Sequence, residues 1–100
     1  MIGVAIINKA LLEEFRCKTV CEWCKKTTRS GLDPHHLWCR GRGDAFRLDV
    51  RINLAALCRA CHNAVHAGNI LRCDLLAVVA AREGRLQDEM EAEIRRLRWK

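Results

Sequence analysis

The sequence predicts a small α+β domain that bound zinc stabilises, with a hairpin-rich centre and helices at both ends. Two Cys-x-x-Cys pairs, Cys21/Cys24 and Cys58/Cys61, lie on either side of a long insertion, and such pairs are typical of a tetrahedral zinc site with four cysteine ligands. Apolar residues recur at helical spacing towards both termini, whereas residues 17–58 contain most of the turn formers. We expect one domain over residues 1–100, whose modest core a bound metal would help to stabilise.

The first helix is predicted to follow Asn8, whose side chain can accept a hydrogen bond at a helix N-terminus. Ile7, Ala10, Leu11 and Phe15 recur at helical spacing, so this segment should have one apolar face that packs on the core. The helix leads into the first cysteine pair.

Three more helices are predicted, over about residues 57–67, 73–82 and 85–99. Gly68-Asn69 and Gly84 separate them, because Gly and Asn readily take the left-handed conformation that ends a helix. The last two helices form an extension over about residues 70–100. Four apolar residues form a stripe on the last helix, which either packs on the core or makes a dimer contact: Leu86, Met90, Ile94 and Leu97. The protein is therefore expected to be a monomer or a homodimer.

The seven cysteines are interpreted as metal ligands and free thiols because their number is odd and the N-terminus does not resemble a secretory signal. Such use of cysteine is typical of a reducing compartment, so we expect a cytoplasmic protein. Cys17 lies four residues before Cys21 and is an alternative ligand, while Cys39 and Cys73 are interpreted as small apolar residues. No apolar run approaches the ~20 residues that a membrane span needs.

The positive charge is concentrated in the centre of the chain. Residues 16–59 contain ten Lys and Arg against four Asp and Glu, which accounts for the whole net charge of +6. A basic centre between neutral ends favours a polyanionic partner such as DNA. A solvated face that keeps the protein soluble is the alternative.

All four histidines fall in two clusters, His35-His36 and His62 with His66. His62 and His66 are four residues apart on the predicted helix, so both can bind one ion. Because adjacent helical residues point about 100° apart, Cys61 can face the zinc while His62 faces a second site. In an extended segment His35 and His36 point to opposite sides, so one can be a ligand while the other accepts a proton.

These residues resemble the motif of a zinc-containing HNH endonuclease. The resemblance rests on Asp33-Pro34-His35-His36-Leu37, Asn53-Leu54 and the run from Leu57 to Asn63, and it covers about residues 21–68, roughly half the chain. It implies a ββα-metal finger, in which two antiparallel strands, a long loop and a helix surround a metal. It further implies that His35 and His62 are metal ligands, that His36 is the general base, and that Asn53 braces the loop and orients the base.

His66 matches a third histidine ligand in the nuclease-toxin branch of this family. Many members have Asp at the position of His35, so the chain departs from them with a site richer in nitrogen. Carboxylate sites suit Mg²⁺ or Mn²⁺, whereas three imidazoles also suit Ni²⁺ or Zn²⁺. The resemblance thus implies a catalytic divalent metal besides the structural zinc.

The function implied is metal-dependent hydrolysis of DNA phosphodiester bonds, by nicking or double-strand cleavage, with one divalent metal as Lewis acid and His36 as general base. Small enzymes of this type resemble bacteriophage or mobile-element proteins. Trp38 is expected to pack under the hairpin or to stack on the nucleic acid. Asp44 and Asp49 could reach a metal, but they are expected to pair with nearby arginines. Four arginines are predicted to bind DNA phosphates: Arg40, Arg42, Arg47 and Arg51.

Two other functions fit the same residues. The chain could be a nucleic-acid-binding zinc module without catalysis, in which the histidines only pack. It could also be an interaction protein built on its C-terminal helices, such as an adaptor in phage packaging or recombination. The non-catalytic zinc module does not explain why the four histidines are clustered.

Overall fold

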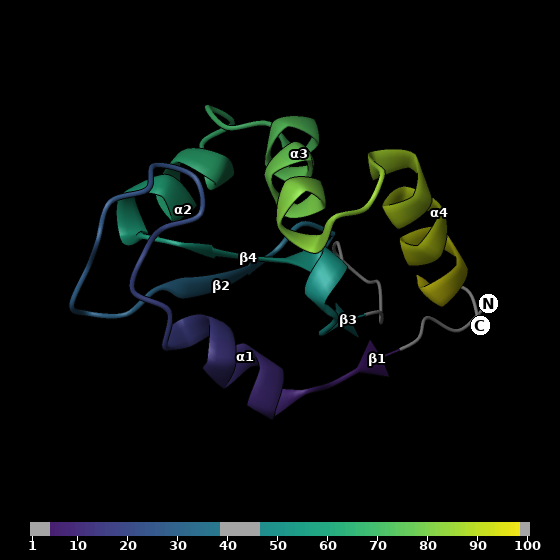
Figure 1. Cartoon of the computed structure of the whole chain (residues 1–100), viewed down its shortest axis with the longest axis horizontal. Helices are drawn as coiled ribbons and strands as arrows, with labels where there is room; N and C mark the ends of the chain where they lie inside the picture. The colour runs from purple at the N-terminus through teal and green to yellow at the C-terminus, as the bar shows by residue number, and fades with distance from the viewer. Residues whose placement is uncertain (1–4, 39–46, 99–100) are drawn as a thin grey trace.

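A computed structural model describes residues 5–38 and 47–98 and shows an α+β arrangement of four helices and two short strand pairs (Figure 1). The predicted fold class is confirmed at this level. The elements, in chain order, are β1 (Ala5–Ile6), α1 (Lys9–Arg16), β2 (Asp33–His36), β3 (Arg47–Leu48), the 3-10 turn η1 (Arg51–Asn53), β4 (Leu54–Leu57), α2 (Arg59–His66), α3 (Arg72–Glu83) and α4 (Gln87–Arg98).

Two short strand pairs lie at the centre. β2 runs antiparallel to β4, with His35 opposite Ala55 and His36 opposite Leu54, and β1 runs parallel to β3. In Figure 1, α1 lies on one side of the β2–β4 pair, and α2 and α3 lie on the other. All four residues of β4 are buried, because this apolar strand is covered from both sides.

The first helix follows the prediction. The Asn8 side chain accepts a hydrogen bond of 3.0 Å from the backbone N–H of Leu11, and Phe15 is fully buried. The expected contribution of Ile7 to the apolar face is wrong, because Ile7 precedes the cap and is exposed.

The later helices also lie close to their predicted ranges. α2 begins at Arg59 rather than near Leu57 because Leu57 is the last residue of the buried strand β4. Gly68 and Gly84 have φ of +84° and +65°, values in the left-handed region that Gly adopts without strain. These two glycines end α2 and α3 as expected.

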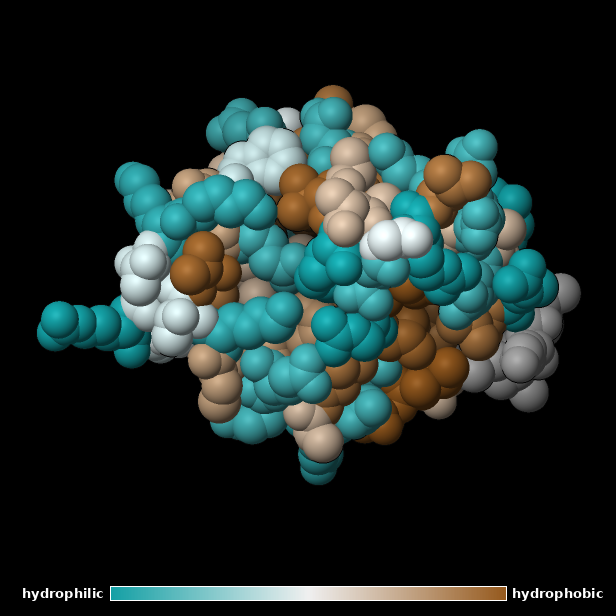
Figure 2. Space-filling view, viewed as in Figure 1, coloured by the Kyte–Doolittle hydropathy of each residue, from teal (hydrophilic) through white to brown (hydrophobic). Residues whose placement is uncertain are grey.

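The apolar stripe of α4 packs on the core. Met90 and Ile94 are 0% and 2% exposed, whereas Leu86 at the start of the stripe is 67% exposed. The packing interpretation is confirmed for the middle of the helix. On the face seen in Figure 2, apolar side chains lie in patches between hydrophilic ones.

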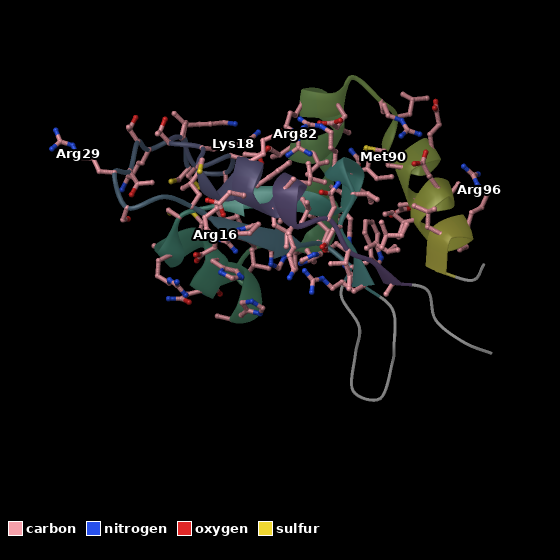
Figure 3. The ribbon with its side chains drawn as sticks, turned by 90° about the horizontal axis from the view of Figure 1, so that it is seen from below. Arg16, Lys18, Arg29, Arg82, Met90 and Arg96 are labelled. Carbon is pink, nitrogen blue, oxygen red and sulfur yellow. The ribbon has the colours of Figure 1, made fainter. Side chains whose placement is uncertain are left out.

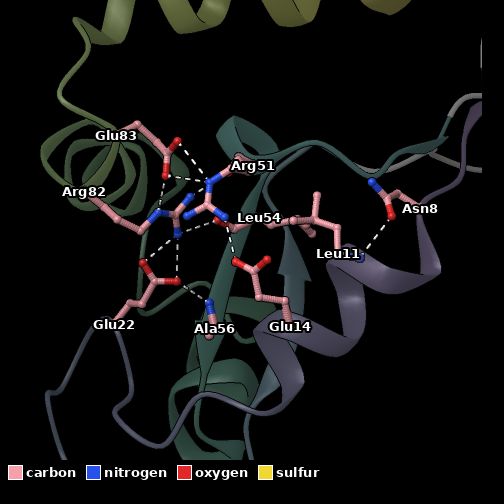
Figure 4. Close-up of polar contacts among 9 residues, drawn as sticks. All are labelled: Asn8, Leu11, Glu14, Glu22, Arg51, Leu54, Ala56, Arg82 and Glu83. Carbon is pink, nitrogen blue, oxygen red and sulfur yellow. Dashed lines mark hydrogen bonds and ion pairs between the residues drawn. The ribbon is translucent and has the colours of Figure 1, made fainter.

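An ion-pair network joins the first cysteine pair to β4 and α3 (Figure 4). The Glu22 carboxylate is buried and accepts hydrogen bonds from the Ala56 backbone N–H, at 2.6 Å, and from Arg82 Nη1, at 2.7 and 2.8 Å. Arg82 also donates to the backbone carbonyls of Leu54 and Arg51. Because a buried carboxylate needs such partners, this network fixes the turn at Cys21–Cys24 relative to the sheet.

No helix among residues 5–38 and 47–98 has the length and apolar character needed to cross a membrane.

Candidate functional site

Four cysteines form a cluster that could hold a structural metal such as zinc. Their Sγ atoms all lie within 4.8 Å of one another, and Cys24 Sγ is 3.8 Å from Cys58 Sγ. Two sulfurs at ~2.3 Å from a tetrahedral zinc ion would be about 3.8 Å apart. The other two members of the cluster are Cys21 and Cys61.

The alternative ligand Cys17 lies outside this cluster. Its thiol is exposed and donates a hydrogen bond of 3.4 Å to Glu13 Oε1, whereas Cys21 is buried within the cluster. The choice of Cys21 over Cys17 agrees with this geometry. Cys73 is exposed and also lies outside the cluster, and Cys39 lies outside the described residues.

The electrostatics of the cysteine cluster favour a cation. Burial would raise the pKa of Cys21, but backbone N–H groups of Cys58, Cys24 and Trp23 outweigh it and lower that pKa to about 6. Burial, with hydrogen bonds from the neighbouring thiols, raises the pKa of Cys61. A divalent cation offsets the repulsion that would otherwise keep these sulfurs from all being thiolates.

Three histidines form a second cluster. One ring nitrogen from each of His35, His62 and His66 lies within 4.8 Å of the others, and the two Nε2 atoms of His62 and His66 are 3.1 Å apart. Two nitrogens at ~2.1 Å from a tetrahedral ion would be about 3.4 Å apart. The predicted pairing of His62 and His66 on one helix face is present, and β2 supplies the third imidazole.

The protonation of these histidines fits a metal site. Burial, followed by the positive charge of the neighbouring histidines, lowers the pKa of His35 to about 4, so its ring is neutral over the physiological range. His62 Nδ1 is 3.0 Å from Asp33 Oδ2. Since a carboxylate accepts the hydrogen bond, Nδ1 carries the proton and Nε2 retains the lone pair that faces His66.

The role of Asp33, which accepts a hydrogen bond from His62 Nδ1, was not predicted from the sequence. Asp33 and His35 are two residues apart on β2, so their side chains lie on the same face of the strand. A carboxylate two residues before a histidine that could bind a metal is the signal that could have identified this role.

His36 lies on the opposite face of β2 and outside the histidine cluster. Its Nε2 is 2.7 Å from Asp49 Oδ1, and Arg47 donates two hydrogen bonds of 3.0 Å to the same carboxylate. Burial would raise the pKa of Asp49, but the hydrogen bonds from Arg47, from the Asn8 backbone and from His36 lower it overall. Asp49 is therefore a carboxylate, His36 Nε2 donates to it, and Nδ1 is left to accept a proton.

Asn53 joins the two sides of the connection between β2 and β3. Its buried side chain accepts a hydrogen bond of 2.8 Å from Trp38 N–H and donates to the carbonyls of Trp38 and Leu48, both at 2.9 Å. These hydrogen bonds hold Trp38 beside Leu48 of β3. A role of Asn53 in bracing the loop stays a prediction. The His36 ring is held by a different residue, because its Nε2 donates a hydrogen bond to the Asp49 carboxylate.

The predicted DNA-binding arginines have different surroundings. Arg40 and Arg42 lie outside the described residues, as does Asp44. Arg47 pairs with Asp49, as expected for that carboxylate. Arg51 pairs with Glu14 and Glu83, at 2.7 and 3.3 Å, and it links α1 to α3. A role of Arg47 or Arg51 in DNA binding stays a prediction.

A cavity of about 310 Å³ adjoins the histidines. Its lining includes His35, His36, His66 and Arg72. The cavity therefore brings two members of the histidine cluster together with His36 and a cation from α3.

Three comparisons, with models of protein families, with curated proteins and with solved structures, found no match to this chain.

Proposed function

We propose that this protein is a metal-dependent DNA endonuclease in which His36 is the general base. The observation that carries the proposal is the division of the histidines. Three of them bring their nitrogens together, while His36 points to the other face of β2 and is held by a carboxylate. The three clustered histidines suit a metal site, and the separate His36 suits a proton acceptor.

In the proposed reaction, a water molecule attacks the phosphorus while His36 Nδ1 takes its proton. A new P–O bond forms, the bond from phosphorus to the 3′ oxygen breaks, and the leaving oxygen takes up a proton from a solvent water to give a 3′-hydroxyl and a 5′-phosphate. General-base assistance of this kind is worth about 10²- to 10⁴-fold. A divalent ion held by His35, His62 and His66 would supply Lewis acidity towards the phosphate.

The order of elements supports a ββα-metal finger. β2 carries His35 and His36, β4 pairs with it, and α2 carries His62 and His66. Cys58 immediately precedes α2 and Cys61 lies in its first turn. A metal in the cysteine cluster would therefore hold α2, and its histidines, in a defined orientation relative to β2.

DNA is the proposed substrate because the basic charge is concentrated in the segment that contains the histidines of β2. Arg40, Arg42, Arg47 and Arg51 remain our proposed contacts to phosphates. For Arg47 and Arg51, binding would require the guanidinium to share or exchange its present carboxylate partners.

The test is nicking of supercoiled plasmid by the zinc-loaded protein in Mg²⁺, Mn²⁺, Ni²⁺ or added Zn²⁺. We expect nicking that depends on the added metal and that falls by at least about 10²-fold in His36→Ala. Lys26→Ala is a control because Lys26 is exposed and lies in neither cluster. A His36→Ala protein that nicks at the wild-type rate would contradict the mechanism. DNA binding without nicking in any metal would favour the non-catalytic zinc module.

A further inference from the structure

Arg72 stands out among the cations that surround the proposed reaction site. It is the first residue of α3, and its guanidinium carbon lies over the ring of Trp38 at 5.1 Å from the centroid. Trp38 follows His36 by two residues, packs against the core and is held through its backbone by Asn53. The Trp38 ring is thus a fixed support for the Arg72 side chain. A guanidinium that stacks through its face keeps its N–H edge for an anion.

Arg72 has no carboxylate within ion-pair distance in the described part of the chain. The same is true of Arg29, Arg95 and Arg96, but only Arg72 and Arg95 among these four line a cavity near Trp38. Six other described arginines have carboxylate partners: Arg16, Arg47, Arg51, Arg59, Arg82 and Arg85. Stacking fixes the position of Arg72, but its charge is left unneutralised by the described side chains. This combination is typical of a site for an external anion.

Two cavities meet at Arg72. One is the cavity beside His35, His36 and His66. The other has a volume of about 370 Å³ and is lined by Trp38, Cys73, Glu91, Ile94 and Arg95, together with Arg72 itself. A groove bounded by α3 and α4 therefore begins at the cation that borders the proposed reaction site.

We infer that Arg72 and Arg95 form a phosphate-binding subsite, in which Arg72, supported by Trp38, binds a DNA phosphate next to the one that is cleaved and Arg95 binds the following part of the backbone. The inference rests on the proposed function for its substrate. It assigns the strand a direction away from the histidines, along the groove between α3 and α4. Arg72 and Arg95 are positioning residues, since they hold the substrate rather than take part in proton transfer.

Glu91 places a negative charge in the proposed phosphate-binding groove. Its carboxylate lines the same groove as Arg95, so it should oppose an incoming phosphate. Removal of that charge is expected to strengthen DNA binding, in the opposite direction to removal of either arginine.

The experiment measures binding of a fluorescein-labelled DNA duplex by anisotropy, with the full-length zinc-loaded protein carrying His36→Ala to prevent cleavage. In this background we expect Arg72→Gln and Arg95→Gln each to raise Kd by about 5- to 10-fold. Each should also reduce the slope of log K against log salt by about one. Glu91→Gln should lower Kd by about twofold.

Arg96→Gln is the matched control, because it removes the same charge from the neighbouring residue of α4. Figure 3 shows Arg96 pointing outwards from that helix, and Arg96 lines neither cavity. Its effect on Kd should stay below about twofold, and Arg72→Lys should bind with intermediate affinity because it keeps the charge without the planar stack. If Arg72→Gln and Arg95→Gln match Arg96→Gln in both Kd and salt slope, the subsite is overturned.

The same variants are also made with His36 intact, and their plasmid-nicking rates are measured. These rates distinguish a failure of the subsite from a failure of the proposed function. If the wild-type protein nicks DNA, and Arg72→Gln and Arg96→Gln have equal DNA affinity and equal nicking rates, the proposed subsite is wrong and the proposed function stands. If the wild-type protein never nicks DNA but Arg72→Gln still loses DNA affinity, the proposed nuclease reaction is wrong and the contact between Arg72 and a phosphate is supported. If Arg72→Gln fails to retain zinc, the Arg95→Gln and Glu91→Gln pair decides the same question.

Discussion

The Asp49 carboxylate holds the His36 imidazole through a hydrogen bond of 2.7 Å between Oδ1 and Nε2. Asp49 is buried and also accepts two hydrogen bonds from Arg47 and one from the Asn8 backbone. A carboxylate fixed in this way determines which His36 nitrogen carries the proton and how the ring is turned. Asp49 is thus a positioning residue for the proposed base.

Asp49→Asn is expected to lower the nicking rate by about 10- to 100-fold, because an amide holds the imidazole less strongly and does not enforce one tautomer. The ¹⁵N shifts of the His36 ring should move towards a tautomer mixture in the same variant. For the ring shifts alone, Arg47→Gln is the control, since it removes an ion pair of Asp49 but leaves the bond to His36. Unchanged ring shifts in Asp49→Asn would show that Asp49 does not orient His36.

Cys58→Ser should lose the structural metal and cooperative unfolding, because metal binding of this type contributes about 10–16 kcal/mol to the folding of small zinc domains. Cys73→Ser is the matched control. Cys73 is exposed and lies outside the cysteine cluster, so its replacement should change stability by less than about 0.5 kcal/mol. Metal content by mass spectrometry and thermal unfolding are the measurements. Full zinc content in Cys58→Ser would rule out the cluster as the zinc site.

Stability of the protein without metal at the histidines should fall as the pH drops from about 6.5 to about 4. Burial lowers the pKa of His35 from 6.5 to about 4, so the unfolded chain binds more protons than the folded one in this range. The stabilisation is complete above pH 6.5, is lost on acidification and reaches its minimum near pH 4. Thermal unfolding of wild type and His35→Gln, compared across this range, isolates the effect. Equal pH slopes for the two proteins would contradict it.

Asn53→Ala should destabilise the protein by about 3 kcal/mol, because the backbone groups of Trp38 and Leu48 would lose their hydrogen bonds in the interior. Asn63→Ala, at an exposed position on α2, serves as the comparison and should change the free energy of unfolding by less than about 0.5 kcal/mol. Urea unfolding measures both. A small effect at Asn53 would mean that the β2–β3 connection is held in another way.

Local patterns were sufficient to predict the parts of the site that lie within one element. The i, i+4 spacing of His62 and His66, the alternation of His35 and His36 on a strand, and the Cys-x-x-Cys spacing each follow from helix, strand or turn geometry. The structure brings the members of each cluster together as those patterns indicated.

Contacts between distant segments could not be predicted in the same way. The partner of His36 is Asp49, which directly follows β3, the strand that pairs with β1. The ion pairs of Arg51 come from α1 and α3, so no pattern near Arg51 distinguishes a structural arginine from one that binds DNA. The stacking of Arg72 on Trp38 likewise depends on how α3 packs on the sheet.

In the proposed mechanism, His36 accepts a proton during metal-dependent cleavage of DNA. Single-turnover cleavage of a plasmid by wild type and His36→Ala, at saturating divalent metal and with equal zinc content, tests it most directly. We expect a rate at least about 10²-fold lower for His36→Ala with DNA affinity within about twofold of wild type. Equal single-turnover rates for the two proteins would contradict it.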